Sequence, residues 1–242
     1  MDVLDFRSRC EATNVPLFQL ISRAMSTITA ALHVFGDGRE VVLSFNGGKD
    51  STVVLHLLRA VIAERRAASV DCGGAGALGA VRVVFFSNAA REFLELGEFM
   101  RDVAASHDFV IEHLPGLRDG LRTLVDRGAR GVLMGTRNGD PAAASLCGPF
   151  SPTSLGWPPV MRVCPILDWA YGDVWAFLNG ACLPVCALYA KGYTSLGGAD
   201  DSVPNRELRV GISEGGVEVF RPAWELVDSS LERAGRNAGN IK

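Results

Sequence analysis

Small and polar residues gather where a predicted strand meets a predicted helix. The segment 44–51 reads Ser-Phe-Asn-Gly-Gly-Lys-Asp-Ser and lies between an apolar run at 41–45 and a stretch of helical spacing at 50–64. Adjacent glycines let the backbone turn tightly and expose its N–H groups. The N-terminus of the following helix adds the positive end of its dipole, which favours a phosphate group. We therefore expect a phosphate-binding loop, with Lys49 adding a mobile positive charge.

This loop is not the P-loop of the common nucleoside triphosphatases. That motif needs glycine where Leu43 stands and serine or threonine where Asp50 stands. Asn46 and Asp50 instead offer oxygen atoms, which suit Mg²⁺ because that ion bridges phosphates and retains waters. The plainer alternative for Asp50 is a first-turn carboxylate stabilised by the helix dipole.

A second candidate region begins after the predicted strand 131–136. Asp140 lies where ligands bind in open α/β sheets, at the carboxyl ends of the strands. Its plainer alternative is an Asp-Pro turn with Pro141. The segment 137–160 is rich in Pro, Gly and Ser and too long for an idle connector, so we expect a binding loop.

Aromatic and cationic residues flank this loop and the end of the chain. Rings such as Trp157 and Trp169 near Arg162 suit a flat heterocycle with a phosphate tail. Taken singly, each is more typical of core packing. Arg233 and Arg236 are three apart at the C-terminal end of a helix expected over 224–234, where one phosphate could meet both. The alternative is a solvated helix terminus.

Strand-like and helix-like segments alternate along the first half of the chain. This order predicts a doubly wound, mostly parallel α/β sheet, whose strands read as continuous apolar runs because helices cover both faces. The predicted strands are 41–45, 81–87, 109–114 and 131–136, and the predicted helices are 14–36, 50–64, 92–107 and 117–127. Later elements are a strand at 161–166, a helix near 173–178, a short strand at 217–220 and the helix at 224–234. The segment 67–80 reads as a surface loop.

Charge and composition exclude several classes of protein. The net charge is −3, so we expect neither a nucleic-acid partner nor a membrane surface as partner. The N-terminus lacks the features of a secretory signal, and the long uncharged stretches at 141–161 and 174–190 are interrupted by polar or turn-forming residues. The six cysteines contain no Cys-x-x-Cys pair, which favours reduced, mostly buried thiols in a cytoplasmic protein.

The segment 44–51 resembles the pyrophosphatase loop of the adenine-nucleotide α-hydrolase superfamily. Further segments, in their order and spacing, resemble eukaryotic-type FAD synthetases, which are FMN adenylyltransferases with a fold like that of phosphoadenylyl-sulfate reductase. These segments are 133–137 with 140–141, 150–153 with 156–158, 161–163, 165–169, 174–178, 192–197 and 221–223. The resemblance covers about residues 40–236.

The resemblance implies a reaction of ATP with FMN that gives FAD and pyrophosphate and requires Mg²⁺. It implies a single stand-alone domain over 1–242, with an ATP-binding core at 1–136 and a flavin-binding loop and C-terminal irregular or helical extension at 137–242. No obligate protein partner is expected.

The resemblance also implies roles for particular residues. The catalytic set is Asn46, Asp50, Asp140, Arg233 and Arg236, with Asn46 and Asp50 as metal ligands. The ATP-binding set is Ser44, Phe45, Gly47, Gly48, Lys49, Ser51 and Thr136. The FMN-binding set is Ser154, Trp157, Met161, Arg162 and Asp168. The family usually has Asp where this chain has Ser154, so this chain lacks the carboxylate at that position.

Two alternatives come from other classes of protein. A reductase of phosphoadenylyl sulfate shares the segment 192–197 but needs a reactive C-terminal cysteine, and no cysteine follows Cys186. The second alternative is a relative that binds a flavin or a nucleotide but catalyses no reaction. The presence of Asn46, Asp50, Asp140 and both arginines favours an enzyme.

Overall fold

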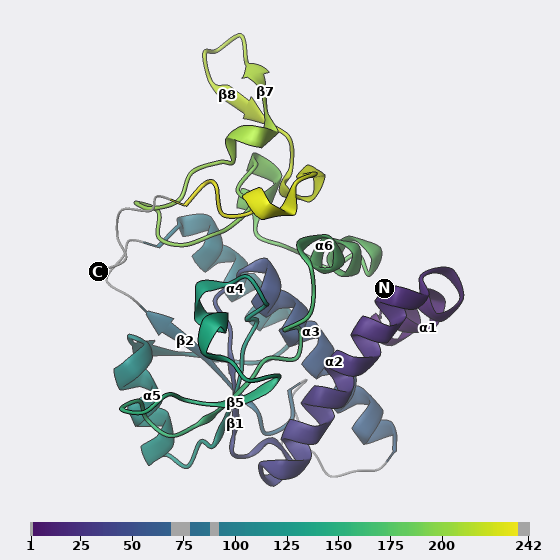
Figure 1. Ribbon diagram of the computed structural model, residues 1–242, viewed down its shortest axis with the longest axis vertical. Helices are drawn as coiled ribbons and strands as arrows, with labels where there is room; N and C mark the ends of the chain where they lie inside the picture. The colour runs from purple at the N-terminus through teal and green to yellow at the C-terminus, as the bar shows by residue number, and fades with distance from the viewer. Residues whose placement is uncertain (1, 69–77, 88–91, 237–242) are drawn as a thin grey trace.

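A six-stranded sheet forms the centre of the molecule (Figure 1). The computed structural model describes residues 2–68, 78–87 and 92–236. The sheet runs in the order β3-β2-β1-β4-β6-β5. The strands are β1 (Val41–Ser44), β2 (Arg82–Ser87), β3 (Ile111–Pro115), β4 (Gly131–Leu133), β5 (Phe150–Pro152) and β6 (Met161–Val163). All neighbours pair in parallel except β5, which is antiparallel to β6. The expected doubly wound, mostly parallel sheet is confirmed.

The strand order reverses between β1 and β4. From β1 the chain moves outward through β2 to β3, then returns to β4 on the other side of β1 and continues to β6. Such a switch point leaves a crevice at the carboxyl ends of the two central strands. The loop after β1 and the segment after β4 therefore start side by side.

Helices cover the two faces of the sheet unequally. The helices are α1 (Val3–Thr13), α2 (Val15–Val34), α3 (Lys49–Ala67), α4 (Leu94–Ser106), α5 (Leu117–Asp126) and α6 (Tyr171–Gly180). Alternate strand residues face opposite ways. Val41 and Leu43 join the larger core with α1–α4 and α6, and Val42 joins a smaller core under α5. Figure 1 shows α5 on the opposite side of the sheet from α2 and α3.

The N-terminal helix expected over 14–36 corresponds to α2, and a further helix, α1, precedes it. The Asn14 side chain accepts a hydrogen bond from the Leu17 N–H and caps α2, as predicted, while its own N–H donates to Cys10 and ends α1. Polar residues dominate α1, so the apolar pattern alone did not reveal it. Among the described helices, only α2 is long and apolar enough to cross a membrane, yet Ile21, Ala24 and Ile28 are fully buried in the core.

The helix predicted over 224–234 is wrong. The segment forms two short 3₁₀ turns, Ala223–Glu225 and Ser229–Leu231. Its carbonyls bond to distant groups, since the Asn205 amide donates to Leu231 O and the Thr194 hydroxyl donates to Glu232 O. These hydrogen bonds tie the segment to buried residues that lie far away in the sequence. Nearby, the strand expected at 217–220 is β8 (Glu218–Phe220), which forms a hairpin with β7 (Arg209–Ile212).

Other expectations are met in part. The binding-loop segment 137–160 contains a 3₁₀ turn at Pro141–Ser145 and strand β5, neither of which was predicted. The surface loop expected over 67–80 lies largely outside the described residues. The described cysteines are all free. Cys10, Cys164 and Cys186 are buried and Cys147 and Cys182 are exposed, so most of the described thiols are buried, as expected.

Gly135 allows the segment after β4 to cross the N-terminus of α3. A Cβ at this position would lie 2.7 Å from both the Asp50 carbonyl carbon and the Ser51 nitrogen. Because these are backbone atoms, we expect Gly135→Ala to lower the free energy of unfolding by about 1–3 kcal/mol. Urea denaturation measures the change.

Gly172→Ala is the matched control for this prediction. Gly172 lies in α6, and a Cβ there meets no heavy atom within 4 Å, so alanine should leave stability unchanged or raise it by up to about 1 kcal/mol. Equal stability of the Gly135→Ala protein and the parent would contradict the close approach.

Candidate active site

The loop between β1 and α3 has the shape expected of a phosphate-binding turn. Gly47 has a φ of +70°, and a Cβ there would lie 2.9 Å from Leu96 and Met100 of α4. The Asn46 side-chain oxygen accepts hydrogen bonds from the Gly48 N–H at 3.0 Å and from the Ser51 hydroxyl at 2.8 Å. These contacts fix the turn, so Gly47 and Asn46 shape the loop from within.

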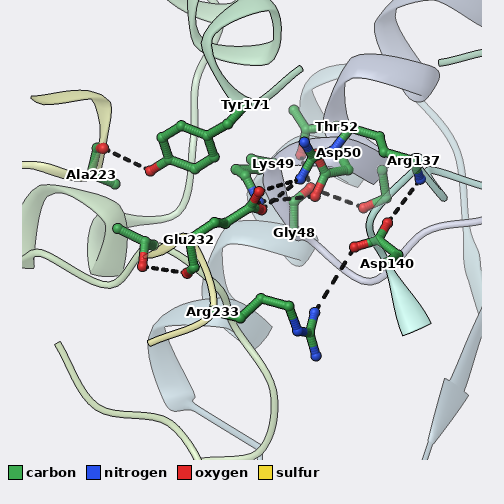
Figure 2. A network of polar contacts seen from close by, with 12 residues as sticks. Gly48, Lys49, Asp50, Thr52, Arg137, Asp140, Tyr171, Ala223, Glu232 and Arg233 are labelled. Atoms are coloured by element: carbon green, nitrogen blue, oxygen red, sulfur yellow. Dashed lines mark hydrogen bonds and ion pairs between the residues drawn. The ribbon is translucent and has the colours of Figure 1, made fainter. Parts of the chain in front are cut away.

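Four charged side chains meet at the start of α3 (Figure 2). The Lys49 ammonium lies 3.0 Å from Asp50 Oδ2 and 2.6 Å from Glu232 Oε1. On the other side, Arg137 Nε lies 2.8 Å from Asp50 Oδ1, and Arg137 Nη2 contacts both oxygens of Glu232 at 2.5 and 2.7 Å. Two cations and two carboxylates thus form one closed network.

The two cations of this network are almost fully buried. The side chain of Lys49 is 3% exposed and that of Arg137 is 5% exposed. Burial alone would lower the pKa of Lys49, but the carboxylates of Asp50 and Glu232 outweigh it and raise that pKa above its ordinary value. The same balance raises the pKa of Arg137. Lys49 is therefore a charged side chain held by two carboxylates. The expectation that it adds a mobile positive charge is corrected.

Tyr189 supports the backbone of the loop. Its hydroxyl oxygen accepts a hydrogen bond of 2.7 Å from the Lys49 N–H. This N–H belongs to the first turn of α3, where backbone donors have no partner within the helix. Burial raises the pKa of Tyr189 well above its usual value, so the phenol stays neutral.

A cavity of about 380 Å³ opens beside the loop at the switch point of the sheet. The predicted catalytic and ATP-binding residues that line it are Ser44, Asn46, Gly48, Lys49, Asp50, Ser51, Thr136, Asp140 and Arg233. Phe45 does not line it, because its side chain is fully buried in the core beside Phe109. Gly47 is also absent from the wall, since it packs against α4.

A second, mostly apolar cavity of about 210 Å³ lies on the α5 side of the sheet. Of the predicted FMN-binding residues, Ser154, Trp157 and Arg162 line it, together with Leu117, Leu121, Val132 and Val160. Met134 and Ala142 line both cavities, so the two adjoin.

Two residues of the predicted FMN set lie elsewhere. Met161 precedes Arg162 on β6 and so points to the opposite face, where it packs against the larger core. The Asp168 carboxylate binds Arg23 of α2 at 2.7 Å, away from both cavities. Neither side chain lines the apolar cavity with Ser154, Trp157 and Arg162, because proximity in sequence does not fix the direction of a side chain.

The two C-terminal arginines do not share a face. Arg233 lines the polar cavity, and its nearest carboxylate oxygen is Asp140 Oδ1 at 3.9 Å. Arg236 instead lies against Gly197 and pairs with Asp201 at 3.4 Å. The expectation that both reach one phosphate is therefore corrected, because the helix that would align them is not formed.

Sequence reasoning gave no role to three residues of the site. Arg137 ends the segment 133–137, and its position after a strand at the switch point is a signal that could have indicated a site residue. Glu232 precedes Arg233, but its charge gives no sign of a partner far away in the sequence. Tyr189 lies in a 3₁₀ turn, and no pattern in the sequence points to it.

Comparisons with known proteins agree with this fold. The phosphoadenosine phosphosulfate reductase domain model matches residues 40–115 and 113–204. A probable FAD synthase of Caenorhabditis briggsae is 37% identical over 96% of this chain and 42% of its own length. One of Schizosaccharomyces pombe is 34% identical over 81% of this chain and 71% of its own length. The structure of yeast FAD synthetase in complex with FAD is 25% identical, with a TM-score of 0.77 over 92% of this chain and 90% of that one.

A mostly parallel sheet with a glycine-containing loop at its switch point defines a doubly wound α/β protein. The chain belongs to the phosphoadenosine phosphosulfate reductase domain family, in the branch formed by the FAD synthases. The resemblance found in the motifs is thereby confirmed. The chain spans less than half the length of the nematode relative.

Replacing Tyr189 by phenylalanine tests the support of the loop. The Lys49 N–H would remain buried without its acceptor, which costs about 1–3 kcal/mol. We expect this loss in the free energy of unfolding, measured by urea denaturation. Tyr193→Phe is the control, since the structure gives the Tyr193 hydroxyl no hydrogen bond to the described residues; equal losses in both variants would contradict the role of Tyr189.

Proposed function

We propose that this chain is an FMN adenylyltransferase that makes FAD and pyrophosphate from ATP and FMN. The observation that supports it best is the pair of adjoining cavities. One is polar and lies at the phosphate loop, and the other is apolar and lined by Trp157 and Arg162. The names of the relatives agree with this activity.

The arrangement suits transfer of an adenylyl group between two bound substrates. A phosphate oxygen of FMN attacks the α-phosphorus of ATP, and the bond from that phosphorus to the pyrophosphate oxygen breaks. FMN supplies its own nucleophile, so the chain needs only to position the two groups in line and to balance charge. The positive end of the α3 dipole would hold the leaving phosphates, and Arg233 would meet charge that develops in the transition state.

The residues of the polar cavity fit Mg²⁺ as an ion held mainly by the substrate. Asp50 and Asp140 line it with side chains that are 23% and 24% exposed, and the described residues contain no group of three or more metal-ligating side chains. Mg²⁺ often binds through one or two carboxylates plus phosphates and water. Asp50 would hold the ion, which neutralises phosphate charge when bound. Asn46 stays a predicted ligand, although its side-chain oxygen already accepts two hydrogen bonds.

Chromatographic detection of FAD from FMN and ATP, with and without Mg²⁺, tests this function. We expect Mg²⁺-dependent formation of FAD and a loss in kcat of about 100-fold or more in Asp50→Asn, comparable to removing one transition-state contact. Asp119→Asn is the matched control, because Asp119 also lies in the first turn of a helix but its side chain is 73% exposed. Absence of FAD from the parent protein, or full activity of Asp50→Asn, would contradict the proposal.

The two arginines should differ in their effects on turnover. Arg233→Ala is expected to lower kcat by about 10²–10³, because Arg233 faces the polar cavity. Arg236→Ala should mainly lower the melting temperature, because Arg236 ties the end of the chain to Asp201. Steady-state kinetics and thermal denaturation separate these effects, and a kcat loss in Arg236→Ala as large as that in Arg233→Ala would contradict the assignment.

A further inference from the structure

The segment 223–236 is anchored mainly through its backbone carbonyls. Tyr171 donates a hydrogen bond to Ala223 O at 2.7 Å, Asn205 donates to Leu231 O at 2.8 Å, and Thr194 donates to Glu232 O at 2.7 Å. Thr194 and Asn205 are buried. These anchors do not depend on which side chain stands at position 232, so the segment can stay in place when that side chain changes.

The Glu232 side chain has a separate task. Its carboxylate reaches across to Lys49 and Arg137, with contacts of 2.5 to 2.7 Å, and it is only 15% exposed. With Asp50, the network holds two positive and two negative charges and is neutral as a whole. The positive charges of Lys49 and Arg137 are therefore already balanced before any phosphate enters.

Arg233 is in a different electrostatic situation. Its side chain is 42% exposed, and its nearest carboxylate oxygen lies 3.9 Å away. It lines the polar cavity directly after Glu232 in the chain. An incoming phosphate would thus meet Arg233 and the N-terminus of α3, while Lys49 remains bound to Glu232.

We propose that Glu232 is a positioning residue that neutralises Lys49 and Arg137 and so leaves Arg233 as the cation for the nucleotide phosphates. The inference rests on the proposed function, because it takes the bound phosphates to be those of ATP and of the pyrophosphate product. Without the Glu232 charge, the network of Lys49, Arg137 and Asp50 would carry one more positive than negative charge, and the wall of the cavity would be more positive by one unit.

Isothermal titration with inorganic pyrophosphate tests this proposal. Glu232→Gln removes a negative charge and leaves the network with a net charge of about +1. Pyrophosphate should then bind about tenfold more tightly, since unit charges a few ångströms apart interact strongly at a partly buried site. The kcat for FAD formation should fall about tenfold or more, because the product is held too tightly and Lys49 competes with Arg233 for the phosphate. A residue that only maintained the fold would not strengthen the binding of an anion.

Two further variants serve as controls. Glu232→Asp keeps the charge and should recover most of the kcat lost in Glu232→Gln, with pyrophosphate binding near that of the parent. The double variant Lys49→Met with Glu232→Gln restores a neutral network of Asp50 and Arg137, so its pyrophosphate affinity should return to within about threefold of the parent. This variant also carries the test if Glu232→Gln alone does not fold.

The outcomes separate this proposal from the proposed function. Unchanged or weaker pyrophosphate binding in folded Glu232→Gln, or loss of pyrophosphate binding in the double variant, would overturn the role of Glu232. If the parent protein makes no FAD while pyrophosphate affinity shifts as expected, the proposed activity fails and the electrostatic role of Glu232 stands.

Discussion

Neutralisation of two buried cations is the constraint on which the site depends. Lys49 and Arg137 are almost fully buried at the start of α3, and a buried charge without a partner costs several kcal/mol. Asp50 and Glu232 supply the compensating carboxylates. Glu232 lies near the end of the described chain, so its ion pairs with Lys49 and Arg137 hold the C-terminal segment against the loop at 44–51.

The topology of the sheet explains why these groups can meet. Asp50 follows β1 and Arg137 follows β4, and these adjacent strands run in parallel, so their carboxyl ends open at the same edge. The close approach at Gly135 brings the segment after β4 against α3. The same segment then turns to the α5 side, where it lines the apolar cavity. The carboxyl end of β4 thus lies between the two cavities, and Met134, which follows it, lines both.

Local patterns in the sequence predicted the sheet, most helices and the loop at 44–51, because each depends on short-range periodicity or on glycine and helix geometry. They failed at 224–234, where hydrogen bonds from buried Thr194 and Asn205, which lie far away in the sequence, hold the segment. They also misjudged Lys49, since its partner Glu232 lies 183 positions away. The directions of the Met161 and Asp168 side chains depend on which face of β6 each residue occupies and on how α2 packs. Sequence motifs give neither.

A crystal structure of the protein with a non-hydrolysable ATP analogue would test the central claim most directly. If Lys49 and Arg137 are neutralised within the network, the Lys49 ammonium should keep its contacts with Asp50 and Glu232 while Arg233 and the N-terminus of α3 bind the phosphates. A structure in which Lys49 leaves Glu232 and binds the phosphates, with Arg233 turned away to solvent, would contradict the account.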